Sequence, residues 1–170
     1  IDRVANEGFE NGDGGHGSFP STVRASSQAA PATKAPKKEG IVVRQLGHIE
    51  GSGDTIVENG WLGDPDSDHR IEGFALSIKN APEGVTLAYS ALVQGAQRYA
   101  TALAGQFVGT RQKAKSIEGV VFELTGPRAD QFRLSGEVVF AGEPPLAIES
   151  GFQLSGPSGT EHLVAVQIAI

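Results

Sequence analysis

Apolar and polar residues alternate in three segments that are evenly spaced along the chain. These segments span residues 70–78, 116–124 and 162–170. Their apolar positions stay in phase, because 46 residues separate Ile71 from Ile117 and 46 separate Ile117 from Leu163. Such alternation is typical of a half-buried β-strand, and a fixed period of this length indicates a repeat architecture. We therefore expect three copies of one unit, each of which ends in one of these strands.

The alternation also predicts which residues of the closing strand share a face. In the first copy, Ile71 falls on one face and Phe74, Leu76 and Ile78 fall on the other. Each copy carries a small residue two positions after its first apolar residue: Gly73, Gly119 and Ala165. A small residue inside a strand indicates either a bulge or the close approach of another backbone, and the pattern leaves both alternatives open.

Each repeat contains about four short runs of strand-forming residues, and the repeats cover approximately residues 41–78, 85–124 and 131–170. In the first repeat, Asn59-Gly60 is typical of a type I′ hairpin turn, so a hairpin is expected there. The Ala- and Leu-containing segment 92–104 is not assigned to a helix. The same place in the other repeats carries Gly-Ser-Gly and Pro-Pro, which do not fit a helix.

These elements predict an all-β domain over residues 41–170. Three four-stranded units can bury their apolar faces against one another about a pseudo-threefold axis, as in a β-prism or, alternatively, a β-trefoil. Residues 1–40 differ, because a glycine-rich stretch at 11–17 is followed by a Ser-, Ala-, Pro- and Lys-rich stretch. This composition is typical of an extended arm or linker.

Composition excludes several classes of protein. The 170 residues contain no Cys, so disulfides and thiolate chemistry are absent. The net charge of −6 argues against a nucleic-acid-binding surface. No apolar run approaches the roughly 20 residues that span a bilayer. The chain also lacks Met at position 1, so we expect it to begin after a processing step, such as removal of a signal peptide, or at the boundary of a fragment.

The second repeat resembles the clostridial hydrophobic-with-conserved-W repeat family. The resembling residues are Tyr89–Gln94, Ala104–Thr110 and Ser116–Leu124, and the resemblance thins in the first and third repeats. It implies a non-catalytic cell-surface or secreted module that binds glycans or proteins. The family's Gly-Trp pair would fall near Gln97-Arg98 and is absent, so a ligand-binding role of that tryptophan is not carried over.

The candidate ligand-binding residues are Trp61, Asp64, Asp66 and Asp68. An exposed Trp61 would stack on a sugar ring, whereas a buried one would anchor the core between sheets. The alternating aspartates resemble a calcium loop, but the sixth and twelfth positions lack the Gly and Glu of an EF-hand. A looser calcium site and a solvated acidic turn both remain as interpretations. The other repeats show no equivalent aromatic residue, so at most one such site is expected.

No motif for catalysis is present. Glu72 and Glu118 occupy equivalent positions and could form paired carboxylates, although threefold symmetry favours a structural role. There is no nucleophile elbow, zinc-binding helix or phosphate loop. We therefore expect no enzyme activity and no cofactor, and no metal apart from the calcium alternative at Asp64, Asp66 and Asp68.

The expected function is recognition of a glycan or another surface ligand, such as a surface protein, in an extracellular or cell-surface adhesion module. The alternative is a structural subunit of an extracellular filament or virion. In that case residues 1–40 would join copies into a homo-oligomer through apolar residues such as Phe9, Phe19 and Val23.

Overall fold

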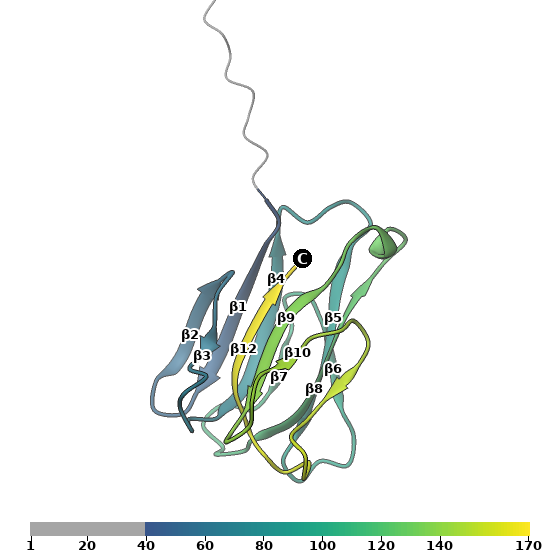
Figure 1. Ribbon diagram of the computed structural model, residues 1–170. Helices are drawn as coiled ribbons and strands as arrows, with labels where there is room; N and C mark the ends of the chain where they lie inside the picture. Colours follow the sequence, from purple (N-terminus) through teal and green to yellow (C-terminus); the bar gives the residue numbers. More distant parts are fainter. Residues whose placement is uncertain (1–39) are drawn as a thin grey trace, which may run out of the picture. The chain divides into compact units, whose positions relative to one another are not determined.

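The computed structural model describes residues 40–170, which form one compact unit (Figure 1). This part of the chain contains β-strands and one short 3₁₀ turn, η1 (Ala129–Gln131), but no α-helix. The strands of the first repeat are β1 (Val42–Ile49), β2 (Gly53–Glu58), β3 (Leu62–Gly63) and β4 (Ile71–Lys79). Those of the second are β5 (Thr86–Val93), β6 (Ala100–Leu103), β7 (Phe107–Gly109) and β8 (Ile117–Thr125). Those of the third are β9 (Ser135–Phe140), β10 (Leu146–Ala147), β11 (Gln153–Leu154) and β12 (Leu163–Ala169).

The strands form three four-stranded antiparallel sheets. The first has the order β2-β1-β4-β7, the second β11-β8-β5-β6 and the third β10-β9-β12-β3. Each sheet is built around the first and last strands of one repeat. The predicted all-β fold with three similar units is therefore confirmed. Because the sheets are open and separate, the arrangement is that of a β-prism and not the closed barrel of a β-trefoil.

The third strand of every repeat belongs to a different repeat's sheet. β7 of the second repeat pairs with β4 of the first, and β11 of the third pairs with β8 of the second. β3 of the first repeat pairs with β12 of the third, which closes the ring. Each unit therefore completes its neighbour's sheet, and no repeat contains all four strands of a sheet.

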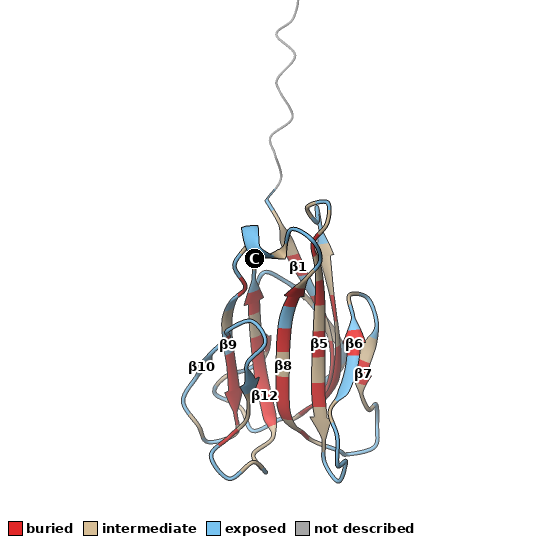
Figure 2. Ribbon diagram, turned by 90° about the vertical axis from the view of Figure 1, so that its right-hand side faces the viewer, coloured by how far each residue is buried: buried red, intermediate tan, exposed pale blue. Residues whose placement is uncertain are grey.

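The core lies between the three sheets. The closing strands β4, β8 and β12 contact one another in pairs, and their core-facing residues are buried, as Figure 2 shows for β8 and β12. Phe74 of the first sheet packs against Tyr89 and Phe122 of the second, with ring centroids 5.5 and 5.9 Å apart. The apolar residues that keep the 46-residue phase all belong to this core or pack against it.

Each closing strand bulges one residue after its start. In the first sheet Ile71 pairs with Ile49 and Gly73 pairs with His48, so Glu72 has no partner in the ladder. The other two closing strands show the same irregularity. The extra residue turns Ile71 and Phe74 toward the same core. The bulge alternative is thus confirmed, and the prediction that Ile71 faces away from Phe74 is wrong.

The hairpin expected at Asn59-Gly60 is also wrong. β2 pairs with β1, whereas β3 pairs with β12, so the two flanking strands belong to different sheets. Asn59 has a positive φ of 49°, and its Oδ1 accepts a hydrogen bond from the Val43 amide at 3.0 Å. The buried Gln45 donates through Nε2 to the Gly60 carbonyl at 2.7 Å. These contacts hold the chain at the point where it crosses to the third sheet.

Candidate functional site

Trp61 lies at a position that the repeat defines. It immediately precedes β3, and the 46-residue step places Phe107 and Gln153 at the same position in the second and third repeats. The strand registers support this equivalence. Gly63 pairs with Ala165 in the third sheet, and Gly109 pairs with Gly73 at the corresponding place in the first sheet. An aromatic residue equivalent to Trp61 therefore exists in the second repeat, and the prediction that none exists is wrong.

An aromatic ring covers the small residue of each closing strand on the outer face of its sheet. A Cβ on Gly73 would collide with the Phe107 ring, and one on Gly119 would collide with the hydroxyl of Tyr99. Trp61 packs beside Ala165 against Val139 and Val164. The half-buried Trp61 is therefore an anchor on the outside of the third sheet and does not lie between sheets.

A groove of about 290 Å³ opens beside Trp61 at the end of the molecule where β1 turns into β2. Its lining combines the indole ring with hydroxyl, carboxylate and imidazole groups. The lining residues are Ile49, Ser52, Thr55, Trp61, Gly63, Asp64, Ser67 and His69. The structure thus brings Trp61 and Asp64 together, as the sequence indicated.

The loop after β3 is held by its own hydrogen bonds. Asp64 Oδ1 accepts from the Asp66 amide at 2.9 Å, and the Asp64 carbonyl accepts from the Ser67 amide at 3.1 Å. His162 Nε2 donates to the Asp68 carbonyl at 2.7 Å and ties the loop to the third repeat. Asp66 and Asp68 are exposed on this loop but do not line the groove. Within residues 40–170, no three acidic or imidazole side chains converge in a way that could hold a metal ion.

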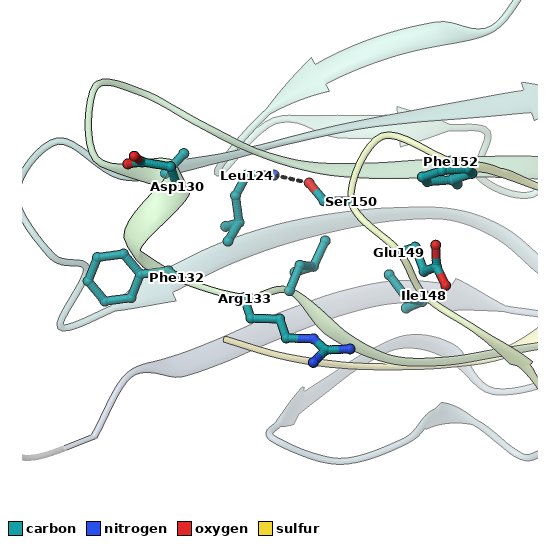
Figure 3. Close-up of a pocket in the computed structure, with 10 residues that line it drawn as sticks. Leu124, Asp130, Phe132, Arg133, Ile148, Glu149, Ser150 and Phe152 are labelled. Atoms are coloured by element: carbon teal, nitrogen blue, oxygen red, sulfur yellow. Dashed lines mark hydrogen bonds between the residues drawn. The ribbon is translucent and has the colours of Figure 1, made fainter.

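A second cavity, of about 540 Å³, lies where β8 ends and β9 begins (Figure 3). The buried side chains of Leu124, Leu134 and Ile148 form its apolar floor. Phe132 and Phe152 flank it, and 62% of Phe152 is exposed. Asp130, Arg133 and Glu149 provide the charges of the rim. Sequence reasoning missed this site, because its residues come from two separate segments, 124–134 and 148–152, that carry no shared motif.

Polar side chains also cluster on the outer face of the first sheet. His48 Nδ1 lies 2.7 Å from Asp54 Oδ1, Arg111 Nε lies 3.3 Å from the same oxygen, and the Arg111 guanidinium stacks on Phe107 at 3.7 Å. The hydrogen bond from His48, followed by that from Arg111, lowers the pKa of Asp54. Since each member is engaged by another, this cluster joins β1, β2 and the loop after β7.

Several predicted residues are not part of either cavity. Glu72 is 5% exposed, and its Oε2 accepts from the Lys113 amide at 3.1 Å, so it holds the loop after β7. Glu118 lies on β8 in another sheet, so the two carboxylates belong to different sheets. The arm residues Phe9, Phe19 and Val23 lie outside the described residues, and assembly through residues 1–40 stays a prediction. In the part of the chain that the structure describes, no helix has the length and apolar character needed to cross a membrane.

The chain matches no protein-family model, no curated protein and no solved structure. The resemblance to the clostridial hydrophobic-with-conserved-W repeats therefore stays a prediction.

Proposed function

We propose that residues 40–170 form a non-catalytic module that binds a glycan in the groove beside Trp61, outside the cell or at its surface. The supporting observation is that Trp61 and Asp64 line one groove together with three hydroxyl side chains: Ser52, Thr55 and Ser67. A sugar presents an apolar ring face and polar ring edges. An indole face suits the former, and carboxylate and hydroxyl groups suit the latter.

The position of Trp61 supports this role further. Because it packs against Val139 and Val164, the ring is held in place before any ligand arrives. A rigid aromatic side chain loses little conformational entropy on binding, so more of the contact energy appears as affinity. Asp64 is fixed in the same way by its bond from the Asp66 amide.

The test is a glycan array with the full chain, followed by titration calorimetry on the best glycan. Trp61→Phe keeps an aromatic ring against Val139 but reduces the stacking surface, and we expect affinity to fall at least fivefold. Asp64→Asn keeps the acceptor for the Asp66 amide but removes the charge, and we expect a similar loss.

Phe107→Leu is the matched control, because Phe107 occupies the equivalent position of the second repeat and does not line the groove. Its affinity should stay within twofold of wild type. If the array shows no bound glycan, or if Trp61→Phe and Asp64→Asn bind as tightly as wild type, the proposal is wrong.

A further inference from the structure

The cavity between β8 and β9 has a different chemistry from the Trp61 groove. Its floor consists of the aliphatic side chains Leu124, Leu134 and Ile148, which are only 4–8% exposed. A sugar placed there would leave hydroxyl groups against hydrocarbon without partners, which is costly. The floor instead suits an apolar group of the ligand.

The rim of the cavity carries charges that the protein leaves unpaired. Among residues 40–170, the side chains of Asp130, Arg133 and Glu149 form no hydrogen bond or ion pair with one another or with other described residues. Figure 3 shows Asp130 and Phe132 at one end of the cavity, Glu149 and Phe152 at the other, and the Arg133 guanidinium between these ends. Each end therefore carries one carboxylate and one aromatic ring, and both kinds of group attract an ammonium ion.

Arg133 disfavours ligands that carry only a positive charge. A guanidinium repels a ligand that is only cationic, and it binds a carboxylate through two parallel hydrogen bonds. Conversely, two carboxylates disfavour a ligand that is only anionic. A ligand with one ammonium and one carboxylate satisfies both kinds of group, and an apolar body between them fits the floor.

We propose that this cavity binds a short apolar peptide with free, charged ends. The ligand's carboxylate contacts Arg133, its ammonium contacts Asp130 or Glu149, and its apolar side chains lie on the floor and against Phe152. A volume of about 540 Å³ lies within the range of small-ligand sites and suits two or three residues.

The experiment titrates the full chain with the dipeptide Leu-Phe and with two blocked forms of it, followed by calorimetry or amide chemical shifts. The free dipeptide should bind at least tenfold more tightly than either the N-acetylated or the C-amidated form. Arg133→Gln should weaken the free dipeptide about tenfold and should make the free and amidated forms bind equally.

The remaining variants separate the contributions of the other groups. Asp130→Asn combined with Glu149→Gln should make the free and N-acetylated forms bind equally, and Phe152→Ala should weaken all three forms. Arg98→Gln, Glu123→Gln and Leu103→Ala change matched exposed residues that do not line the cavity, and these variants should bind like wild type.

The proposal is overturned if the dipeptide does not bind, or if blocking its ends or changing Arg133 leaves its affinity unchanged. These outcomes are independent of the glycan site, because no residue of the Trp61 groove lines this cavity.

Discussion

The Tyr89 hydroxyl links the second sheet to the first, because it bonds to Leu76 of β4. The Tyr89 side chain is 1% exposed, and its hydroxyl donates to the Gln106 carbonyl and accepts from the Leu76 amide at 3.0 Å. Burial raises the pKa of this hydroxyl, although its bonds to Leu76 and Gln106 act in the opposite direction. Tyr89→Phe should lower the free energy of unfolding by about 1–3 kcal/mol, because the carbonyl and amide lose their partner. Urea denaturation measures this loss.

Tyr99→Phe is the control for this prediction. The Tyr99 hydroxyl is buried against Gly119 and has no hydrogen-bond partner within the described residues. Removing it should leave stability within about 0.5 kcal/mol of wild type or increase it. Equal losses in the two variants would show that the bonds of Tyr89 contribute nothing.

The hydrogen bonds of Asp54 predict that the free energy of unfolding depends on pH in the acid range. Hydrogen bonds from His48 and Arg111 lower its pKa below the ordinary value of 3.8. Its contribution to stability is therefore fully present above pH 3.8 and is lost as pH falls through the lower folded value. The unfolding free energy of wild type should fall more steeply below about pH 4 than that of Asp54→Asn.

Salt and a matched variant check this interpretation. The Asp54 side chain is 49% exposed, so the difference in acid dependence between wild type and Asp54→Asn should be small. It should shrink further at high ionic strength. Asp68→Asn, which changes an exposed carboxylate without a partner in the described chain, should keep the steep acid limb of wild type. An equally steep limb in Asp54→Asn would rule out this contribution.

Individual site residues were predictable only where local sequence carries the signal. Trp61 and Asp64 flank the two-residue strand β3, so proximity along the chain already placed them together. Phe132 and Phe152 line opposite ends of one cavity, and the bond from the Gly151 amide to the Phe122 carbonyl holds the segment before β11 against β8. No local pattern encodes such a contact.

At the scale of elements, the two-residue strand β3 contributes more than its length suggests. Leu62 is fully buried, and its side chain fills the space beside Gly47, where an added Cβ would lie 2.7 Å from Leu62 Cδ2. Leu62→Ala should cost about 2–5 kcal/mol through the cavity it leaves. Thermal or urea unfolding measures this cost.

Leu154 provides the comparison, since it occupies the equivalent position in β11 but is only partly buried. Leu154→Ala should cost less than Leu62→Ala. If Leu62→Ala and Leu154→Ala lower the free energy of unfolding equally, burial of this position does not determine how much the third strand of a repeat contributes to stability.

The long strands and their period were predictable, because alternation and the 46-residue step are properties of the sequence itself. The pairing of the short strands was not. Asn59-Gly60 has the residues of a hairpin turn, but burial of Leu62 in the core between the sheets takes the chain to β12 instead. The free energy of a local turn preference is small compared with the free energy gained by burying a leucine side chain.

At the scale of the whole molecule, the third strand of each repeat completes the sheet of another repeat, and these pairings close into a ring. We therefore expect a single unfolding transition. No sheet can form from one repeat, and the pairing of β3 with β12 joins residues about a hundred positions apart. Trp61, the only tryptophan, precedes β3 and reports on this junction. Its fluorescence and the far-ultraviolet circular dichroism should change at the same urea concentration. A tryptophan transition at lower urea would mean that the ring opens before the sheets unfold.

The direction of β1 determines what the module presents to its surroundings. Residues 40 and 170 lie at the same end of the prism (Figure 1). β1 runs from there to Ile49, at the margin of the Trp61 groove. At about 3.3 Å per residue, its eight residues carry the groove about 25 Å from that end. A support that holds the module by residue 40 or residue 170 would leave the groove facing outward, within reach of large ligands on an opposing surface. The cavity between β8 and β9, beside η1, would lie at the end nearer the support.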